Sequence, residues 1–409
     1  MPSGVPFIMA KDLIDCHLDL ANCNFITRQL ADTLRIGFAK PGDVLLTHKA
    51  TMGRVAIVPD GYDYIMLTPQ VTYYRIGDRS RLDARFLKCA FLSPPFQHQL
   101  NATSDQSTRK YIGISAQRDL WIPVPPPAEQ RAIAHILGTL DDKIELNRQM
   151  NETLEAMARA IFKSWFIDFD PVRAKAEGRD PGLPKPLADL FPDSFEDSEL
   201  GEIPKGWRVG KISDLAILSR DGVTPGDFPD EVFDHYSIPA FDEGRTPTQE
   251  AGEAIKSNKS IVPADCVLLS KLNPRLPRVW LPDVQSARRS VCSTEYLIAV
   301  PRLGVPRKFL YGLLSSDAFL SEFATLVTGT SGSHQRVKPE SLLQMDTVIG
   351  PESIVQRFAS WVTPLLERVR SNIADSGTLA ALRDTLLPKL ISGELRVGTA
   401  RESMEGVPR

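Results

Sequence analysis

The chain has 409 residues, of which 42% are hydrophobic and 24% charged, and its formal net charge is −3. This ordinary composition excludes collagen-like and intrinsically disordered proteins, and the length suggests two to four domains. No apolar run reaches the ~18 residues of a membrane span, and the N-terminus lacks the features of a signal peptide. Five cysteines without CxxC spacing argue against a disulfide framework or a zinc site, and they favour the cytoplasm.

Residues 1–126 predict a first domain that is rich in strands. β-branched alternation between Gly and Pro residues predicts three strands, and a short helix follows over Ala84–Leu92. A loop rich in Ser and Thr then leads to a last strand over Leu120–Val124. The three predicted strands are Asp43–Thr47, Arg54–Val58 and Gln70–Arg75.

One long helix is predicted over residues 127–168. Its seam positions follow alternating spacings of four and three, which is the heptad pattern of a coiled coil. Two asparagines lie mid-seam, where a buried amide fixes helix register at some cost in stability. At ~1.5 Å per residue, a helix of this length spans roughly 63 Å. The seam residues are Ile133, Leu137, Leu140, Ile144, Asn147, Asn151 and Leu154.

Residues 169–204 are rich in Pro, Gly and acidic residues, and we interpret them as an irregular connector. The connector leads to a second domain, predicted over residues 205–350, with the plan of the first. Its predicted elements are strands over Cys266–Ser270, Val279–Leu281, Thr294–Val300 and Met345–Ile349, and a short helix over Arg307–Leu314.

The second domain repeats the first. Asp43 and Asp265 precede matching apolar runs and are 222 residues apart, and Gln130 and Gln356 are 226 apart. Matched blocks in one order with so little drift indicate a duplicated unit, and the period is too long for a solenoid. The blocks are residues 41–47 with 263–270, 85–87 with 308–310, 107–110 with 333–336, and 130–131 with 356–357.

A second long helix is predicted over residues 351–395, followed by a flexible tail over residues 396–409. Two sustained heptad patterns in one chain suggest that the two helices pair with each other. The alternative is that each is an ordinary amphipathic helix packed on its neighbouring domain. The second seam comprises Phe358, Leu365, Val369, Asn372, Leu379 and Leu386.

The repeat also predicts that the first domain is N-terminally incomplete. The second domain opens with Ile203–Trp207 and reaches Tyr236–Pro239 only later, whereas the first starts at Gly4–Ile8, near the counterpart of that later segment. A missing strand leaves an unpaired sheet edge, which favours aggregation.

Five motifs run along nearly the whole chain in a recognisable order. They are Gly42–Leu46, Ile122–Ile133, Leu154–Phe166, Ile203–Trp207 and Leu386–Leu395. With these motifs the sequence resembles the specificity subunits of type I restriction–modification systems.

The resemblance implies an α+β fold in which two target-recognition domains form a pseudo-two-fold repeat. Two long antiparallel helices would separate them as a coiled-coil ruler. The implied function is non-catalytic recognition of a bipartite site on double-stranded DNA, which directs methylation or cleavage by partner subunits. The implied partners are two methylation subunits, which would bind S-adenosylmethionine, and restriction or translocation subunits. No cofactor is expected on this chain.

Two loops of each domain are candidate DNA contacts, because hydroxyl, amide and basic side chains suit phosphates and base edges. The basic loops follow the first matched strand of each domain, and the Ser/Thr loops follow the short helices. Either loop could instead be an ordinary solvated loop. The candidates are Thr47, Lys49, Arg54, Lys271, Asn273, Arg275 and Arg278 in the basic loops, and Ser107, Thr108, Arg109, Lys110, Ser333, His334, Gln335 and Arg336 in the Ser/Thr loops.

Two alternative functions remain open at this point. One is a stand-alone DNA methyltransferase, because Ser93–Phe96 resembles the catalytic tetrapeptide of amino-methyltransferases. No Gly-rich cofactor loop precedes this tetrapeptide, so we interpret it as a proline stop after a helix. The other alternative is a protein-interaction scaffold that does not read DNA. The scattered histidines give no metal-binding spacing, so we assign neither catalytic nor metal-binding residues.

Overall fold

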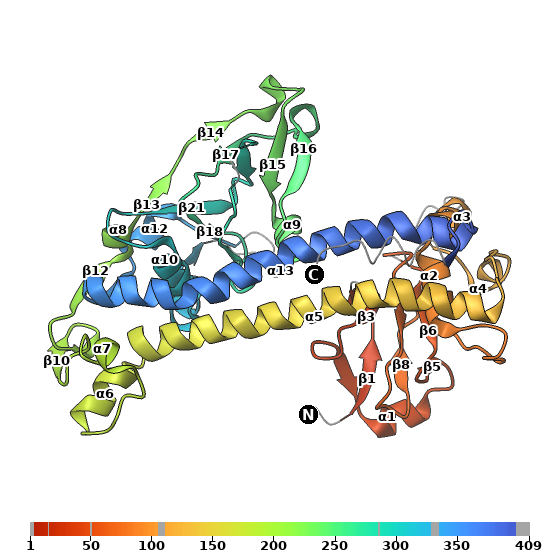
Figure 1. The fold of residues 1–409 in the computed structure, drawn as a ribbon, viewed down its shortest axis with the longest axis horizontal. Coiled ribbons are helices and arrows are strands. Elements are labelled where there is room, and N and C mark those ends of the chain that lie inside the picture. The colour runs from red at the N-terminus through yellow and green to blue at the C-terminus, as the bar shows by residue number, and fades with distance from the viewer. Residues whose placement is uncertain are drawn as a thin grey trace. The chain divides into compact units, whose positions relative to one another are not determined.

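The computed structural model describes residues 4–14, 16–49, 51–104, 111–284, 287–328 and 335–397. Its contacts divide the chain into two compact units, one comprising Met1–Glu145 with Ser376–Arg409 and the other Leu146–Asp375 (Figure 1). Each unit contains one mixed lobe and one part of each long helix. We call residues 4–126 the first lobe and residues 205–350 the second lobe. The predicted α+β class is confirmed.

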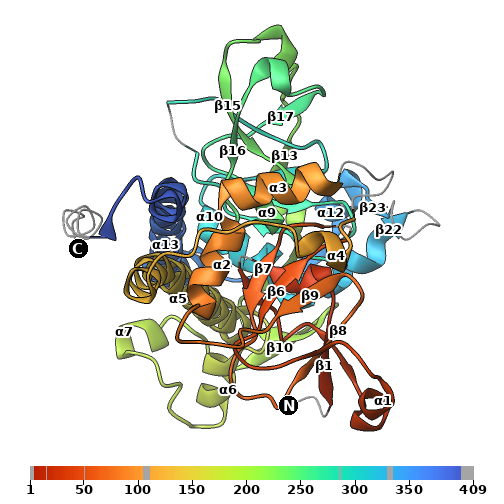
Figure 2. The same cartoon turned by 90° about the vertical axis from the view of Figure 1, so that its right-hand side faces the viewer.

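The first lobe contains two main sheets. One has the strand order β4-β1-β8-β5, and the other has the order β7-β6-β9 (Figure 2). Helix α2 packs on the second sheet through Leu87 and Phe91, which lie in one core with Val44 and Leu46. The elements are β1 (Val5–Ile8), β2 (Leu13–Ile14), β3 (His17–Leu18), β4 (Asn24–Ile26), α1 (Arg28–Thr33), β5 (Phe38–Ala39), β6 (Val44–Thr47), β7 (Val55–Ile57), β8 (Ile65–Leu67), β9 (Val71–Tyr74), α2 (Ala84–Leu92), α3 (Pro94–Ser104) and α4 (Ile114–Gln117).

The second lobe contains the same two sheets with added strands. Its sheets have the orders β14-β17-β20-β15-β16 and β13-β21-β18-β19, and β12 pairs with β24. The strands are β12 (Arg208–Lys211), β13 (Ala216–Ser219), β14 (Gly222–Val223), β15 (Val232–Tyr236), β16 (Thr248–Ala251), β17 (Lys259–Ile261), β18 (Val267–Ser270), β19 (Val279–Trp280), β20 (Ser290–Cys292), β21 (Tyr296–Pro301), β22 (Val327–Thr328), β23 (Arg336–Val337) and β24 (Asp346–Ile349). The helices are α8 (Ile212–Leu215), α9 (Ile238–Asp242), α10 (Arg307–Leu314), α11 (Asp317–Phe323) and α12 (Pro339–Gln344).

The two lobes share a topology, which agrees with the sequence repeat. In the first lobe β1 pairs in parallel with β8, and in the second β15 pairs in parallel with β20. Single side chains repeat as well. The Gln130 amide donates to the Arg81 carbonyl at 2.9 Å, and the Gln356 amide donates to the Gly304 carbonyl at 3.0 Å. Helices α2 and α10 begin and end at the predicted residues.

Residues 120–124 do not form the predicted strand. Their counterpart in the second lobe, β24, is a strand because β12 pairs with it over four residues. Within the described part of the first lobe, no segment pairs with residues 120–124. A strand needs a hydrogen-bonding neighbour, so apolar alternation alone does not produce one here.

The prediction of an irregular connector is wrong, because residues 169–204 form regular secondary structure. The connector contains α6 (Asp170–Ala176), α7 (Lys185–Ala188) and a hairpin of β10 (Phe195–Ser198) with β11 (Gly201–Pro204). Its apolar side chains Val172, Leu187 and Phe191 are buried in the core of the second unit. Pro and Gly interrupt the elements of this segment, and the burial of these side chains holds the elements together.

The two long helices are α5 (Pro127–Phe166) and α13 (Glu352–Ser392), within two or three residues of the predicted bounds. In the first unit Leu137 and Leu140 of α5 share a core with Leu386 and Leu390 of α13. In the second unit Phe162 of α5 stacks edge-on against Phe358 of α13, so the helices run antiparallel in each unit. All the predicted seam residues are buried or half-buried: Ile133, Leu137, Leu140, Ile144, Asn147, Asn151, Leu154, Phe358, Leu365, Val369, Asn372, Leu379 and Leu386.

The seam asparagines meet in the second unit. The Asn372 amide donates to Asn151 Oδ1 at 2.8 Å, and the Asn147 amide donates to the Asn372 carbonyl at 3.4 Å. The Asn372 side chain is fully buried, and its Oδ1 has no hydrogen-bond partner among the described residues. These bonds are made in one helix register only, as the sequence predicted for buried amides.

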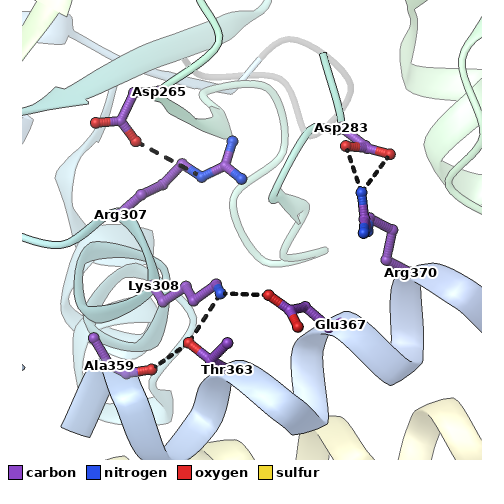
Figure 3. A network of polar contacts seen from close by, with 8 residues as sticks. All are labelled: Asp265, Asp283, Arg307, Lys308, Ala359, Thr363, Glu367 and Arg370. Atoms are coloured by element: carbon purple, nitrogen blue, oxygen red, sulfur yellow. Dashed lines mark hydrogen bonds and ion pairs between the residues drawn. The ribbon is translucent and has the colours of Figure 1, made fainter. Parts of the chain in front are cut away.

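Polar contacts fasten α10 and nearby loops to α13 within the second unit (Figure 3). Lys308 Nζ lies 2.9 Å from Thr363 Oγ1 and 3.3 Å from Glu367 Oε1. Arg370 donates to both carboxylate oxygens of Asp283, at 3.3 and 3.4 Å. The second lobe is therefore fixed to the first half of α13 by charge as well as by its apolar core.

Candidate nucleic-acid interface

In the first lobe, the basic loop (residues 47–54) is joined to the segment that follows the Ser/Thr loop. Lys49 and Tyr111 form an isolated β-bridge, and the Ile112 N–H donates to the His48 carbonyl at 3.1 Å. The buried His48 ring donates from Nδ1 to the Ile112 carbonyl at 3.0 Å. Burial lowers the pKa of His48, so its ring stays neutral and acts as a structural link between the two segments.

Glycine lets the same loop turn tightly. Gly53 has a φ of +85°, and a Cβ on it would lie 2.1 Å from Gln97 Oε1. The Gln97 amide donates to the Gly53 carbonyl at 2.9 Å, and the Arg54 N–H donates to Thr47 Oγ1, also at 2.9 Å. The basic loop is therefore attached to helix α3 as well as to the end of β6.

In the second lobe, the basic loop (residues 270–278) is joined in the same way to residues 335–337, at the end of the Ser/Thr loop. Leu272 and Arg336 form an isolated β-bridge, which corresponds to the Lys49–Tyr111 bridge. The Asn273 N–H donates to the Gln335 carbonyl at 3.0 Å, and the Val337 N–H donates to the Lys271 carbonyl at 3.1 Å. Each lobe thus brings together two chain segments that are more than 50 residues apart.

Carboxylates hold two of the candidate arginines in the second lobe. Arg336 donates two 2.9 Å hydrogen bonds to Glu295, and Arg278 donates to Asp242 at 2.7 and 2.8 Å. The Arg336 guanidinium holds the pKa of Glu295 below its ordinary value. Only 13% of the Arg278 side chain is exposed, whereas Arg275 is exposed and has no ion-pair partner in the part of the lobe that the structure describes.

The predicted contacts differ in accessibility. Lys49, Arg54 and Arg275 are exposed, and Lys271, Asn273, Arg278, Gln335 and Arg336 are half-buried. Thr47 is fully buried, and its hydroxyl is engaged by the Arg54 N–H, so its position is that of a loop support. The remaining candidates lie outside the described residues: Ser107, Thr108, Arg109, Lys110, Ser333 and His334.

Ser93–Phe96 forms the junction of two helices. Ser93 is buried, ends α2 and donates from its hydroxyl to the Ala90 carbonyl at 2.7 Å. Phe96 stacks on Phe91 with ring centroids 4.5 Å apart. The described residues contain no group of three or more His, Cys, Asp or Glu residues that could hold a metal ion, and none of their helices is apolar enough over a bilayer's thickness to span it.

Comparisons with known proteins agree with this geometry. Residues 34–156 match the family model of the type I restriction modification DNA specificity domain. The chain is 27% identical to the MjaIX specificity subunit of Methanocaldococcus jannaschii, over 96% of this chain and 87% of the relative. It is 25% identical to the HindI specificity subunit of Haemophilus influenzae, over 96% and 94%.

The fold agrees as well. A type I restriction–modification S subunit from M. genitalium superposes with a TM-score of 0.52 over 95% of this chain and 92% of that one, at 14% identity. The chain is thus similar to specificity subunits of type I restriction–modification systems along nearly its whole length.

Sequence reasoning missed the groups that organise this candidate interface. Glu295 and Asp242 lie 41 and 36 residues from the arginines that they hold, so no local pattern marks them. His48 is different, because it lies inside the basic loop, between the buried strand β6 and Lys49. Its position at the end of a fully buried strand was a signal that the side chain points inward.

Proposed function

We propose that this specificity subunit reads double-stranded DNA through the two joined loops of each lobe. The observation that carries the proposal is the duplicated β-bridge, Lys49–Tyr111 in one lobe and Leu272–Arg336 in the other. Both copies of the duplicated domain keep this bridge, although their loop sequences differ. We therefore expect the bridged loops of the two lobes to perform the same task. Each lobe would read one half of a bipartite site.

The charges suggest separate tasks within the second interface. Arg275, which is exposed, and Lys271, which is half-buried, would contact phosphates, and such contacts set position and affinity. Arg336 and Arg278 are held in one orientation by carboxylates, which suits recognition of base edges because bidentate contacts to guanine need a fixed guanidinium plane. The amide of Asn273, on a residue with a φ of +48°, is a further base-reading candidate.

We infer that this chain is the non-catalytic component of its assembly. Methylation subunits, two per complex, would bind S-adenosylmethionine and the base, and restriction or translocation subunits would cleave. The proposed place of action is the cytoplasm, where the DNA of the cell lies. The two long helices would set the distance between the two half-sites, since α5 and α13 each continue from one unit into the other.

A binding titration tests DNA reading directly. Affinity of the full chain for a duplex that carries its site is measured by fluorescence anisotropy over a range of salt concentrations. Arg275→Ala should weaken binding to all duplexes alike and reduce the slope of log K against log salt by about one. Arg179→Ala, an exposed arginine paired with Glu177 in the connector, is the matched control and should change neither quantity. A chain without salt-dependent DNA affinity would refute the proposal.

A further inference from the structure

A turn at the end of helix α9 links the basic loop of the second lobe to the long helix α5. The carboxylate of Asp242, the last residue of α9, accepts two hydrogen bonds from Arg278 of the basic loop, at 2.7 and 2.8 Å. Three residues further along the chain, Arg245 donates to the carboxylate of Glu155 on α5. All four residues belong to the second unit, so this series of contacts lies within one compact part of the molecule.

The backbone of the turn has a conformation that side chains rarely allow. Gly244 and Arg245 both have a positive φ, of +116° and +57°. The Arg245 N–H donates to the Ala240 carbonyl at 3.0 Å, which closes the end of α9. A left-handed backbone is costly for a residue with a side chain, and it persists where surrounding contacts enforce it, often at functional sites. The ion pair of Arg245 with Glu155 is such a contact.

This ion pair is largely withdrawn from solvent on the side of α5. The Glu155 side chain is only 8% exposed and that of Arg245 is 37% exposed. Arg159, one turn further along α5, lies 3.8 Å from the second carboxylate oxygen of Glu155. A buried carboxylate needs its cation in a fixed place. Because α5 is one helix of 40 residues, Glu155 is a rigid point of attachment for the turn.

Aromatic packing connects the same turn to the strand that follows the basic loop. The Arg245 guanidinium lies over the Phe241 ring, 5.1 Å from its centroid. Phe241 packs edge-on against Trp280 of β19, with ring centroids 5.6 Å apart. Since β19 begins directly after Arg278, α9 holds the end of the basic loop both by charge and by packing.

The first lobe repeats the inner part of this link. Arg54 directly precedes β7, as Arg278 directly precedes β19. The Arg54 guanidinium donates to the Leu13 carbonyl at 3.0 Å. Leu13 lies in the segment after β1, which corresponds to α9 after β15, because β1 and β15 are the parallel-paired strands of their lobes. Both lobes therefore tie the last arginine of the basic loop to the same part of the fold.

We propose that Arg245 and Glu155 are positioning residues for DNA recognition by the second lobe, acting through α9 on Arg278. The inference rests on the proposed function, in which Arg278 reads a base edge. Asp242 is bound by Nε and Nη2 of Arg278, so the edge formed by Nη1 and Nη2 is directed away from the carboxylate, toward a base. A displacement of α9 turns this edge, and the tie to α5 prevents the displacement.

The test measures how well the full 409-residue chain discriminates between base pairs. Affinity is measured by fluorescence anisotropy for a duplex that carries the site and for duplexes with single base pairs replaced. Arg278→Ala first identifies the base pair at which the penalty for replacement falls most. Arg245→Gly suits a φ of +57°, so it removes the tie without straining the turn. It should lower the penalty at that same base pair at least ~threefold and leave the other half-site unaffected.

A second variant removes the other end of the tie. Glu155→Ala, at a helix position that favours alanine, should lower the same penalty at the same base pair. The double variant should lose no more than either single variant, since both remove one contact.

Arg288→Ala is the matched control. Arg288 pairs with Asp234 in the same lobe at nearly equal exposure of the two side chains, 38% and 7%. This pair does not touch the basic loop, so its loss should leave every penalty within about 1.5-fold of the parent.

Parent-like penalties in Arg245→Gly and Glu155→Ala would overturn the inference, and so would an equal loss in Arg288→Ala. Both results leave the proposed function standing if Arg278→Ala lowers one penalty. If Arg278→Ala lowers none, base reading by Arg278 fails, and the positioning role fails with it. If Arg245→Gly does not fold, Glu155→Ala and the control decide the question.

Discussion

Glu295 illustrates how single charged residues prepare the interface. Its carboxylate accepts two hydrogen bonds from Arg336. It directly precedes β21, and its backbone carbonyl also accepts a hydrogen bond from the Lys271 N–H. One residue thus orients a guanidinium of the Ser/Thr segment and fixes the start of the basic loop. In the proposed interface, this arrangement would reduce the side-chain freedom that Arg336 loses on binding DNA.

The Glu295 contact predicts a pH dependence of stability. Arg336 lowers the folded-state pKa of Glu295 below its ordinary value of 4.5, so the contact stabilises the fold above that pH and is lost as pH falls through the folded pKa. Glu295→Gln should therefore lower the melting temperature at pH 7 and differ less from the parent as the pH falls below about 4.5. Glu253→Gln, at an exposed site of the same lobe, should melt like the parent throughout. A constant difference at all pH values would contradict this assignment.

At the scale of elements, the sequence predicted those helices whose ends are set by neighbouring residues. Helix α2 begins directly after Asp83, because the Asp83 carboxylate caps the Arg85 and Phe86 N–H groups. The helix ends before Pro94, and both signals are readable in the sequence. Residues 120–124 could not be predicted in this way, since strand formation depends on a partner elsewhere in the chain. The same holds for the interface, where the loops were found but their β-bridges and the carboxylates that hold their arginines were not.

In the first unit, a buried charge cluster joins α2, α5 and α13. Removing its carboxylate should strongly lower the free energy of unfolding. Asp141 accepts from Lys88 of α2 at 3.0 Å and from Arg383 of α13 at 3.1 Å, and its side chain is 8% exposed. Asp141→Ala leaves two partly buried cations without their carboxylate, and we expect it to cost about 3 kcal/mol.

The neighbouring residue supplies the control for this substitution. Asp142 is exposed on the same helix turn, so Asp142→Ala should change stability by no more than about 0.5 kcal/mol. Both values come from denaturant unfolding followed by circular dichroism. Equal effects of the two substitutions would show that the cluster around Asp141 adds nothing to the attachment of α2 to the helices.

At the scale of the whole molecule, the proposed ruler predicts that helix length controls the DNA spacer. One heptad is inserted into α5 after Glu145 and one into α13 before Ser376, which keeps the seam in phase. Seven residues add about 10.5 Å, which is about three base pairs. With the partner subunits, the methylated site should keep both half-site sequences and gain about three base pairs between them.

Paired insertions of four residues are the control for the ruler. They break the heptad phase and should abolish methylation or destabilise the helix pair. An unchanged spacer in the heptad variant would show that the helices do not measure the DNA.

The central claim is that this chain chooses the DNA sequence on which its partners act. Sequencing that detects methylated bases is the most direct test, applied to genomic DNA from cells with the gene, without it, and with the gene restored. We predict one bipartite methylated motif that disappears on deletion, returns with the parent chain, and in an Asn273→Ala variant becomes degenerate in one half only. A methylation pattern that is the same with and without the gene would contradict the account.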